Sequence, residues 1–357
     1  MTGLRICVIA SSRFPIREPF AGGLEAHTHA LARQLTDRGH EVSLFAAPGS
    51  DPGLQTRELP VQALRSTVFN RPDVDTSPQS WMNEHHAYLG LMLDLARNAH
   101  HFDVVHNNSL HHLPVAMSSM LDVPMVTSLH TPPVPWLESA LEYAAGDSTF
   151  VAVSRFTAQA WSHVVRSVTI PNGVDVERWR PGPGGGSAIW FGRLVPEKGP
   201  HLAIDAAREA GMPLDLAGPC LDGEYFRTQI GPRLGGDVRY LGHLTHEQLR
   251  DAVGRARVAV VTPTWDEPYG LVAAEAMACG TPVAAFDRGA LPEFVDDSVG
   301  ALAAPGDVAA LARAMRVAVG VDRARVRQFA VERCSISVMV DRYEDLYRRV
   351  TTPMAAA

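Results

Sequence analysis

Short apolar runs alternate with amphipathic stretches through the first half of the chain. Residues 5–10 (RICVIA) form a continuous apolar run of strand length, and residues 23–39 place apolar side chains at helical spacing and end at Gly39. A second apolar run at residues 41–47 completes the strand-helix-strand order of a parallel sheet. Further short strands are predicted within residues 102–107, 124–130 and 148–154, with helical segments between them.

The same alternation begins again at Ser187. Residues 187–192 (SAIWFG) are predicted to form a strand, residues 193–199 a loop and residues 200–211 a helix. Later strands are predicted within residues 212–218, 238–242, 258–263 and 282–286. Residues 170–187 are rich in Gly and Pro, so we interpret them as the connection between the two halves.

This order predicts an α/β protein with two Rossmann-like, doubly wound parallel-sheet domains that face each other across a cleft. The predicted domains are residues 1–172 and 173–335, and 357 residues are enough for two cores. A last helix in residues 336–357 has no strand after it and can pack back on either domain. Ligands of such sheets bind at the carboxyl ends of the strands, so the loops after the strands should carry the chemistry.

The charge, the cysteines and the lengths of the apolar runs exclude several classes of protein. A net charge of -7 argues against nucleic acid, because nucleic-acid binding needs a basic face. The four cysteines are scattered and indicate neither a disulfide framework nor a zinc site. No apolar run approaches the roughly 20 residues that span a bilayer, and the first run lacks the basic flank of a signal peptide. We therefore expect a cytoplasmic protein without an integral membrane segment, and the excess of Arg over Lys is typical of a GC-rich bacterial genome.

One lysine stands out, because the other 31 of the 32 basic residues are arginines. Lys198 follows a predicted strand, Gly192 and Arg193, and is expected at the start of a helix. A guanidinium, an ammonium and helix amides at one point are typical of a diphosphate site, since Arg offers a planar fork and Lys a compact point charge. The alternative is an ordinary solvated surface lysine.

Two carboxylates form a second group within residues 266–283 (DEPYGLVAAEAMACGTPV). Glu275 is the only charged residue of an apolar helix predicted from Gly270 to just before Gly280, and a buried carboxylate needs hydrogen-bond donors. The vicinal hydroxyls of a ribose would supply them. Glu267, beside the start of this helix, could accept hydrogen bonds from sugar hydroxyls. The alternative places Glu275 on a half-exposed helix face.

These motifs resemble those of the GPGTP-type glycosyltransferases, the retaining enzymes of family 4 with the GT-B fold. The resemblance lies in Gly192-Arg193 followed by Lys198-Gly199, and in Glu267 and Glu275 followed by Gly-Thr-Pro-Val. Further matches are the Gly22-Gly23 loop and residues 129–131 (LHT), 153–154 (VS), 170–175 (IPNGVD) and 216–219 (LAGP). The resemblance covers nearly the whole chain.

The resemblance implies a role for each matched residue. Arg193 and Lys198 would hold the diphosphate of a nucleotide sugar, Glu275 its ribose and Glu267 its sugar hydroxyls, with His130 near the reacting carbon. The implied catalytic residues are His130, Arg193, Lys198 and Glu267. The implied donor-binding residues are Gly23, Gly192, Arg193, Lys198, Gly218, His243, Leu244, Glu267, Gly270, Leu271, Val272 and Glu275. The pairs His85-His86 and His111-His112 either line the acceptor pocket or are solvated.

The resemblance further implies transfer, with retention, of a hexose or N-acetylhexosamine from a nucleoside-diphosphate sugar to a hydroxyl. UDP is the favoured nucleotide and a soluble small molecule the favoured acceptor. Because no nucleophilic carboxylate stands beside residues 129–131, we expect a front-face mechanism in which the leaving diphosphate takes the acceptor proton. We interpret Asp73-Val74-Asp75, in a polar loop, as chance, and expect no metal and no cofactor beyond the nucleotide-sugar co-substrate. The protein is expected to be a monomer or a homodimer.

Three other functions can be compared with the same residues. A nicotinamide-dependent dehydrogenase needs Gly-x-Gly-x-x-Gly after the first strand, and residues 11–23 do not fit that pattern. A sugar-nucleotide 2-epimerase on the same fold would be recognised by its products in the absence of an acceptor. A non-enzymatic two-lobed sugar-nucleotide-binding protein would not need the cation pair together with Glu267 and Glu275.

Overall fold

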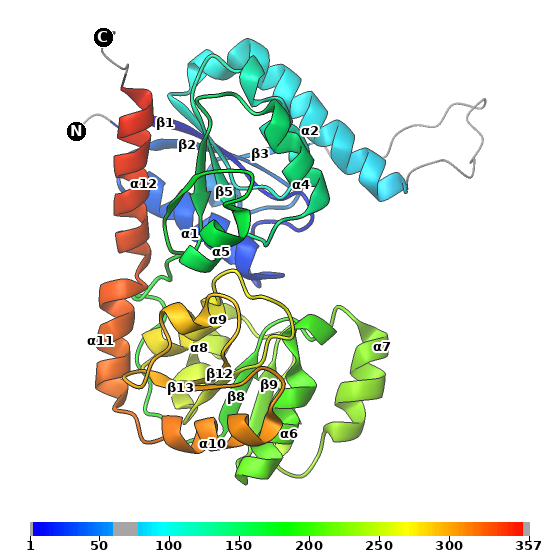
Figure 1. Cartoon of the computed structure of the whole chain (residues 1–357), viewed down its shortest axis with the longest axis vertical. Helices are drawn as coiled ribbons and strands as arrows, with labels where there is room; N and C mark the ends of the chain where they lie inside the picture. Colours follow the sequence, from blue (N-terminus) through cyan, green and yellow to red (C-terminus); the bar gives the residue numbers. More distant parts are fainter. Residues whose placement is uncertain (1–2, 60–77, 353–357) are drawn as a thin grey trace.

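The computed structural model describes residues 3–59 and 78–352, and these residues form two parallel β-sheets (Figure 1). The seven-stranded first sheet has the order β3-β2-β1-β4-β5-β6-β7, and the six-stranded second sheet has the order β10-β9-β8-β11-β12-β13. Each sheet winds outward in both directions from its first strand. The prediction of two doubly wound α/β domains is therefore confirmed.

The element bounds follow the apolar runs closely. The first sheet comprises β1 (Arg5–Ile9), β2 (Glu41–Ala46), β3 (Thr56–Glu58), β4 (Val104–Asn107), β5 (Met125–Leu129), β6 (Thr149–Ala152) and β7 (Ser167–Thr169). The second comprises β8 (Ala188–Phe191), β9 (Leu214–Ala217), β10 (Val238–Tyr240), β11 (Ala259–Val261), β12 (Val283–Phe286) and β13 (Gly300–Ala303). The short strands β3, β7 and β13 lie at sheet edges and were not predicted.

Helices cover both faces of each sheet. In the first domain these are α1 (Gly23–Asp37), α2 (Gln79–Asn98), α3 (His112–Ala116), α4 (Pro135–Ala140) and α5 (Arg155–Trp161). In the second they are α6 (Pro200–Ala210), α7 (Gly223–Tyr225), α8 (His246–Arg255), α9 (Leu271–Ala278), α10 (Val308–Ala318) and α11 (Arg323–Arg333), before the last helix α12 (Ile336–Thr351). No helix in the described ranges is long and apolar enough to cross a membrane.

The alternation of side chains along β1 explains why its run is apolar throughout. Ile6 and Val8 point into a core shared with α1 and α12, whereas Cys7 and Ile9 point into a core shared with α2. Both faces of the strand are therefore buried, as is usual for a parallel sheet between two helical layers. Backbone hydrogen bonds between neighbouring strands fix the position of each strand end, and so fix where the loop after that strand begins.

The last helix crosses back to the first domain and runs alongside it (Figure 1). A buried chain of hydrogen bonds fastens it there. The Tyr347 hydroxyl lies 2.7 Å from Nδ1 of His106, and Nε2 of His106 lies 2.8 Å from Oγ of Ser128. The Ser128 hydroxyl in turn lies 2.9 Å from the Tyr343 hydroxyl. Buried polar groups that satisfy one another in this way fix one arrangement of helix and sheet.

Replacement of Tyr347 by Phe tests this attachment. Tyr347→Phe leaves Nδ1 of buried His106 without its partner, so we expect the free energy of unfolding to fall by about 1–3 kcal/mol. Urea unfolding followed by circular dichroism measures the change. The matched control is Tyr143→Phe, at a side chain that is 67% exposed, and it should change stability by less than about 0.5 kcal/mol. Equal stability of the two variants would show that the hydrogen-bond chain does not hold α12.

Candidate functional site

A cavity of about 360 Å³ lies between the two domains and is lined by loops at the carboxyl ends of strands from both. The two sheets therefore contribute to one site, as expected for ligands of doubly wound folds. Every residue predicted for donor binding or catalysis lines this cavity, namely Gly23, His130, Gly192, Arg193, Lys198, Gly218, His243, Leu244, Glu267, Gly270, Leu271, Val272 and Glu275. Asp73-Val74-Asp75 falls outside the described residues.

Two glycines let the second-domain backbone form the wall of the cavity. Gly192 follows β8 and Gly218 follows β9, with φ values of +145° and +139° that side chains rarely allow. A Cβ atom on Gly218 would lie 1.9 Å from the carbonyl oxygen of Gly192, so the two loops touch backbone to backbone. Main-chain groups thus stand at the cavity surface, and at Gly218 no side chain could fit.

Lys198 does not stand at the start of α6, in contrast to the prediction. It ends a short 3₁₀ turn, Pro196–Lys198, and α6 begins two residues later at Pro200, which has no backbone N–H. No residue of α6 lines the cavity. The helix terminus that does face it belongs to α9, through Gly270, Leu271 and Val272. The amides available to an anion are therefore those of α9.

Lys198 and Glu267 form an ion pair across 69 residues of sequence, with Nζ 2.5 Å from Oε2. Trp265 holds this pair in place. Its indole nitrogen donates to the same Glu267 oxygen at 3.2 Å, and its ring centroid lies 5.0 Å from Nζ of Lys198. Both side chains are mostly buried, at 23% and 14% exposure, so each needs a partner of opposite charge or a ligand that replaces it.

The guanidinium of Arg193 has no hydrogen-bonding or ion-pairing partner among the described residues, although the residue is only partly exposed at the cavity. A carboxylate stands near it, because Glu25 of α1 is buried and the charge of Arg193 acts on it. Burial raises the pKa of Glu25, and the backbone and the positive charge of Arg193 offset part of that rise. The guanidinium is thus free to bind an anion in the cavity.

Glu275 lies on α9 with its carboxylate at the cavity and without a hydrogen-bond partner among the described residues. Burial raises the pKa of Glu275 to about 8, because the surrounding apolar helix cannot solvate the charge. Glu275 is itself partly exposed at the cavity, whereas most other residues of α9 are buried, so the helix does not have the half-exposed face of the alternative interpretation. A ligand that offers two hydroxyl donors would meet this unsatisfied group.

His130 is the first residue after β5 and hydrogen-bonds through Nε2 with the side-chain oxygen of Asn108. The amide nitrogen of Asn108 donates to the Thr28 hydroxyl at 2.9 Å, so its oxygen faces His130 and can only accept. Nε2 therefore carries the proton and Nδ1 keeps its lone pair. Burial lowers the pKa of His130 well below its ordinary value, which keeps the ring neutral.

Two further polar residues of the cavity were missed by sequence reasoning. His27 of α1 is buried, and neither ring nitrogen has a hydrogen-bond partner among the described residues. Its ring centroid lies 5.0 Å from that of His130, and burial lowers its pKa to about 4. Asn172 likewise has a buried side-chain oxygen without a partner. The only sequence signal for Asn172 was its place in residues 170–175, and His27 gave none, because a single His on a helix carries little information.

The loop predicted to contact the base touches the opposite domain. His243, which follows β10, lies with Nε2 3.3 Å from the carbonyl oxygen of Phe20. Nearby, Gly23 faces the same domain boundary, since a Cβ on it would lie 3.0 Å from Cδ1 of Leu271. The loop before α1 therefore closes over the end of the cavity formed by the second domain. The pairs His85-His86 and His111-His112 lie outside the lining of this cavity.

Sequence profiles of two families divide the chain in the same way as the two sheets. The family described as Glycosyltransferase Family 4 matches residues 21–178, and that described as Glycosyl transferases group 1 matches residues 184–327. A glycogen synthase of Mycobacterium tuberculosis is 30% identical over 339 residues, with 83% of this chain and 82% of the relative covered. A D-inositol 3-phosphate glycosyltransferase of Nocardiopsis dassonvillei is 28% identical, with 98% and 96% covered.

Solved structures share the arrangement of the whole chain. AviGT4, a glycosyltransferase involved in avilamycin A biosynthesis, superposes with a TM-score of 0.71 at 24% identity and covers 98% of this chain and 99% of its own. HepE of Anabaena, solved in complex with UDP-glucose, gives a TM-score of 0.73 at 20% identity, with 97% and 100% covered. Together with the family matches, these likenesses show that the chain is a glycosyltransferase of family 4 with the GT-B fold.

Proposed function

We propose that this glycosyltransferase moves a hexose or N-acetylhexosamine from a nucleoside-diphosphate sugar, with UDP favoured, to a hydroxyl of a small soluble acceptor. One observation carries the proposal. The same cavity is lined by the cations Arg193 and Lys198, of which only Lys198 is paired with a carboxylate among the described residues. The amino-terminal end of α9 and the carboxylate of Glu275, which has no partner among those residues, also line it. This set matches the diphosphate and the ribose of a nucleotide sugar group by group.

The diphosphate would lie against Arg193 and Lys198. Within residues 3–59 and 78–352 the Arg193 guanidinium has no partner, and Lys198 would exchange Glu267 for phosphate oxygens. The amides at the start of α9 would add donors, because the first N–H groups of a helix have no partner within the helix. Two cations and these amides can neutralise the diphosphate without a metal ion, so we propose metal-independent donor binding.

Glu275 would take the two ribose hydroxyls, which satisfy its lone pairs and favour its ionised form. Glu267, released from Lys198 when phosphate binds, would then accept hydrogen bonds from hydroxyls of the donor sugar. The wall formed by residues 242–244 would contact the base. The likeness to HepE, whose structure holds UDP-glucose, supports UDP as the nucleotide.

Transfer would proceed on one face of the sugar with retention of configuration. The bond from the anomeric carbon to the phosphate oxygen breaks as the bond to the acceptor oxygen forms, and the acceptor proton passes to the leaving phosphate. Arg193, Lys198 and the α9 amides would stabilise the negative charge that grows on the phosphate. Neutral His130, fixed by Asn108, would contact the donor sugar without adding positive charge beside the oxocarbenium-like carbon.

A panel of nucleotide sugars tests the function directly. At equal concentration the ligand that binds most tightly stabilises the folded chain most, by about 2.7 kcal/mol when its concentration is 100 times its Kd. We therefore expect a UDP-sugar to raise the melting temperature more than GDP-, ADP- and dTDP-sugars. With a competent acceptor, each UDP released should be accompanied by one glycoside whose anomeric configuration is that of the donor. Excess chelator should leave the affinity for UDP unchanged. Conversion of the nucleotide sugar without any acceptor would favour a 2-epimerase instead. Stable binding without turnover for every acceptor would favour a binding protein.

Removal of Lys198 tests the diphosphate site. Lys198→Ala should weaken UDP binding by about 1.5–3 kcal/mol, because a charge-assisted hydrogen bond is lost and Glu267 remains unpaired beside the phosphates. Calorimetry with UDP and with uridine separates the contribution of the diphosphate from that of the nucleoside, because uridine lacks the phosphates and its binding should not change. Arg180→Ala, a cation outside this cavity, is the matched control. Equal UDP affinity for the wild-type chain and Lys198→Ala would remove Lys198 from the donor site.

The raised pKa of Glu275 makes uridine binding depend on pH. Below about pH 8 the free carboxyl is protonated, and it must lose that proton to accept two hydroxyl donors. Uridine affinity should therefore rise with pH, by up to about tenfold per unit, and level off above about pH 8. Glu275→Gln should bind uridine more weakly and remove this rise. Calorimetry across the pH range measures both, and the same pH slope in the variant would contradict the assignment.

A further inference from the structure

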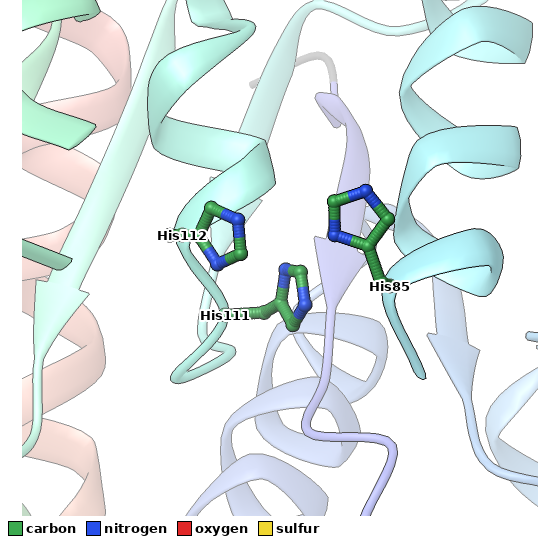
Figure 2. A group of neighbouring side chains, drawn as sticks. All are labelled: His85, His111 and His112. Atoms are coloured by element: carbon green, nitrogen blue, oxygen red, sulfur yellow. The ribbon is translucent and has the colours of Figure 1, made fainter. Parts of the chain in front are cut away.

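Three histidines gather on the first domain, outside the lining of the interdomain cavity (Figure 2). His85 lies on α2, and His111 and His112 lie at the start of α3, so the group joins two helices. One ring nitrogen of each lies within 4.8 Å of one ring nitrogen of both others. Figure 2 shows the three imidazoles turned toward a common space.

We propose that His85, His111 and His112 bind one divalent transition-metal ion of the zinc class. Imidazole nitrogen is a preferred ligand of Zn²⁺, and three such ligands leave a fourth position for water. Zinc at about 2.0–2.1 Å from each nitrogen holds the nitrogens roughly 3.4 Å apart. Binding requires the side chains to rotate from the present arrangement, in which the rings of His111 and His112 stack with centroids 4.4 Å apart.

Each imidazole is backed by an aromatic ring that fixes its plane. His85 stacks on Trp81 with centroids 4.9 Å apart, and His111 stacks on Tyr88 at 4.3 Å. His112 lies beside Trp136, with centroids 5.3 Å apart. The Tyr88 hydroxyl is tied to the end of β1 through the Ala10 carbonyl oxygen at 2.8 Å. Supported ligands of this kind are pre-oriented for a metal ion.

The polar atoms of the group that are unpaired among the described residues point to a metal ion as its occupant. None of the three side chains takes part in an ion pair within residues 3–59 and 78–352, so no carboxylate compensates protonated imidazoles there. Nδ1 of His85 is buried and has no hydrogen-bond partner among the same residues. A lone pair buried without a donor is costly, and a metal ion would satisfy it.

Ordinary aromatic packing is the competing explanation. Nδ1 of His111 accepts the backbone N–H of Leu113 at 3.2 Å, a bond that caps α3. If Nδ1 of His111 bound the metal ion, it would lose this hydrogen bond, and the Leu113 N–H would donate to water instead. Packing alone, however, leaves Nδ1 of His85 without a partner among the described residues.

The position of the group suggests what the ion does. Leu110 lines the interdomain cavity, and the chain passes directly from it to His111. An ion shared by α2 and α3 would therefore stiffen the first-domain wall beside the cavity. It would lie on the opposite domain from Arg193 and Lys198, so it would not replace those cations at the donor diphosphate.

Metal binding by the full, tag-free chain tests the proposal independently of sugar transfer. All proteins carry Cys220→Ser, because Cys220 is an exposed thiol that could itself bind the ion. After treatment with chelator and desalting, Co²⁺ is titrated with visible absorption as the readout and Zn²⁺ by calorimetry. We expect one ion per chain, the intense absorption of a low-coordinate Co²⁺ site and a higher melting temperature with Zn²⁺.

His85→Ala and His112→Ala should each weaken Co²⁺ binding by at least about tenfold, because even losing a residue that only supports a ligand costs about 10- to 100-fold. His86→Ala is the matched control, since His86 is the next residue of α2 and its side chain is exposed. Melting curves without metal establish that each variant folds. Unchanged affinity in both His85→Ala and His112→Ala, or no stoichiometric binding by the parent chain, would overturn the site.

Discussion

The ion pair between Lys198 and Glu267 is the interaction on which the proposed donor site depends. Two largely buried charges from loops after different strands hold each other at 2.5 Å, with Trp265 against both. Such a pair costs desolvation whichever partner the lysine has. A diphosphate that takes the lysine therefore replaces one buried contact by another, and it frees a carboxylate at the place where a sugar would lie. The same step would bind the leaving group and prepare the sugar site.

The surrounding architecture makes this exchange possible. Gly192 and Gly218 let two loops meet backbone to backbone, so the cavity wall is set by the sheet and not by mobile side chains. α9 contributes both its amino-terminal amides and Glu275, which fixes the spacing between the proposed phosphate and ribose positions. Across the cleft, Glu293 of the second domain accepts the backbone N–H groups of Arg155 and Phe156 at 3.0 and 2.6 Å. The domains therefore meet through defined polar contacts beside the site.

Much of this could be predicted from the sequence, for a physical reason. Strands buried on both faces appear as unbroken apolar runs, and parallel topology brings the loops after them to one edge. Gly192, Lys198 and Glu275 could thus be placed near one another from motifs far apart in the chain. The edge strands β3 (TRE) and β7 (SVT) were missed because they carry polar, partly exposed residues, and β13 (GALA) because it is short, begins with Gly and is only partly buried.

Other features depend on tertiary packing and leave no local signal. The partner of Lys198 is 69 residues away, and the docking of α12 rests on hydrogen bonds to His106 and Ser128, which the sequence does not connect. His85 meets His111 and His112 only because α2 and α3 pack together. His27 occupies an ordinary helical position, and only its burial distinguishes it.

A crystal structure of the chain with a UDP-sugar, grown in excess chelator, tests the central claim most directly. We expect phosphate oxygens within about 2.7–3.2 Å of Arg193 and Lys198, Glu267 turned to the sugar and the ribose on Glu275. A nucleotide bound elsewhere, or in this cavity while both cations point into solvent, would contradict the account.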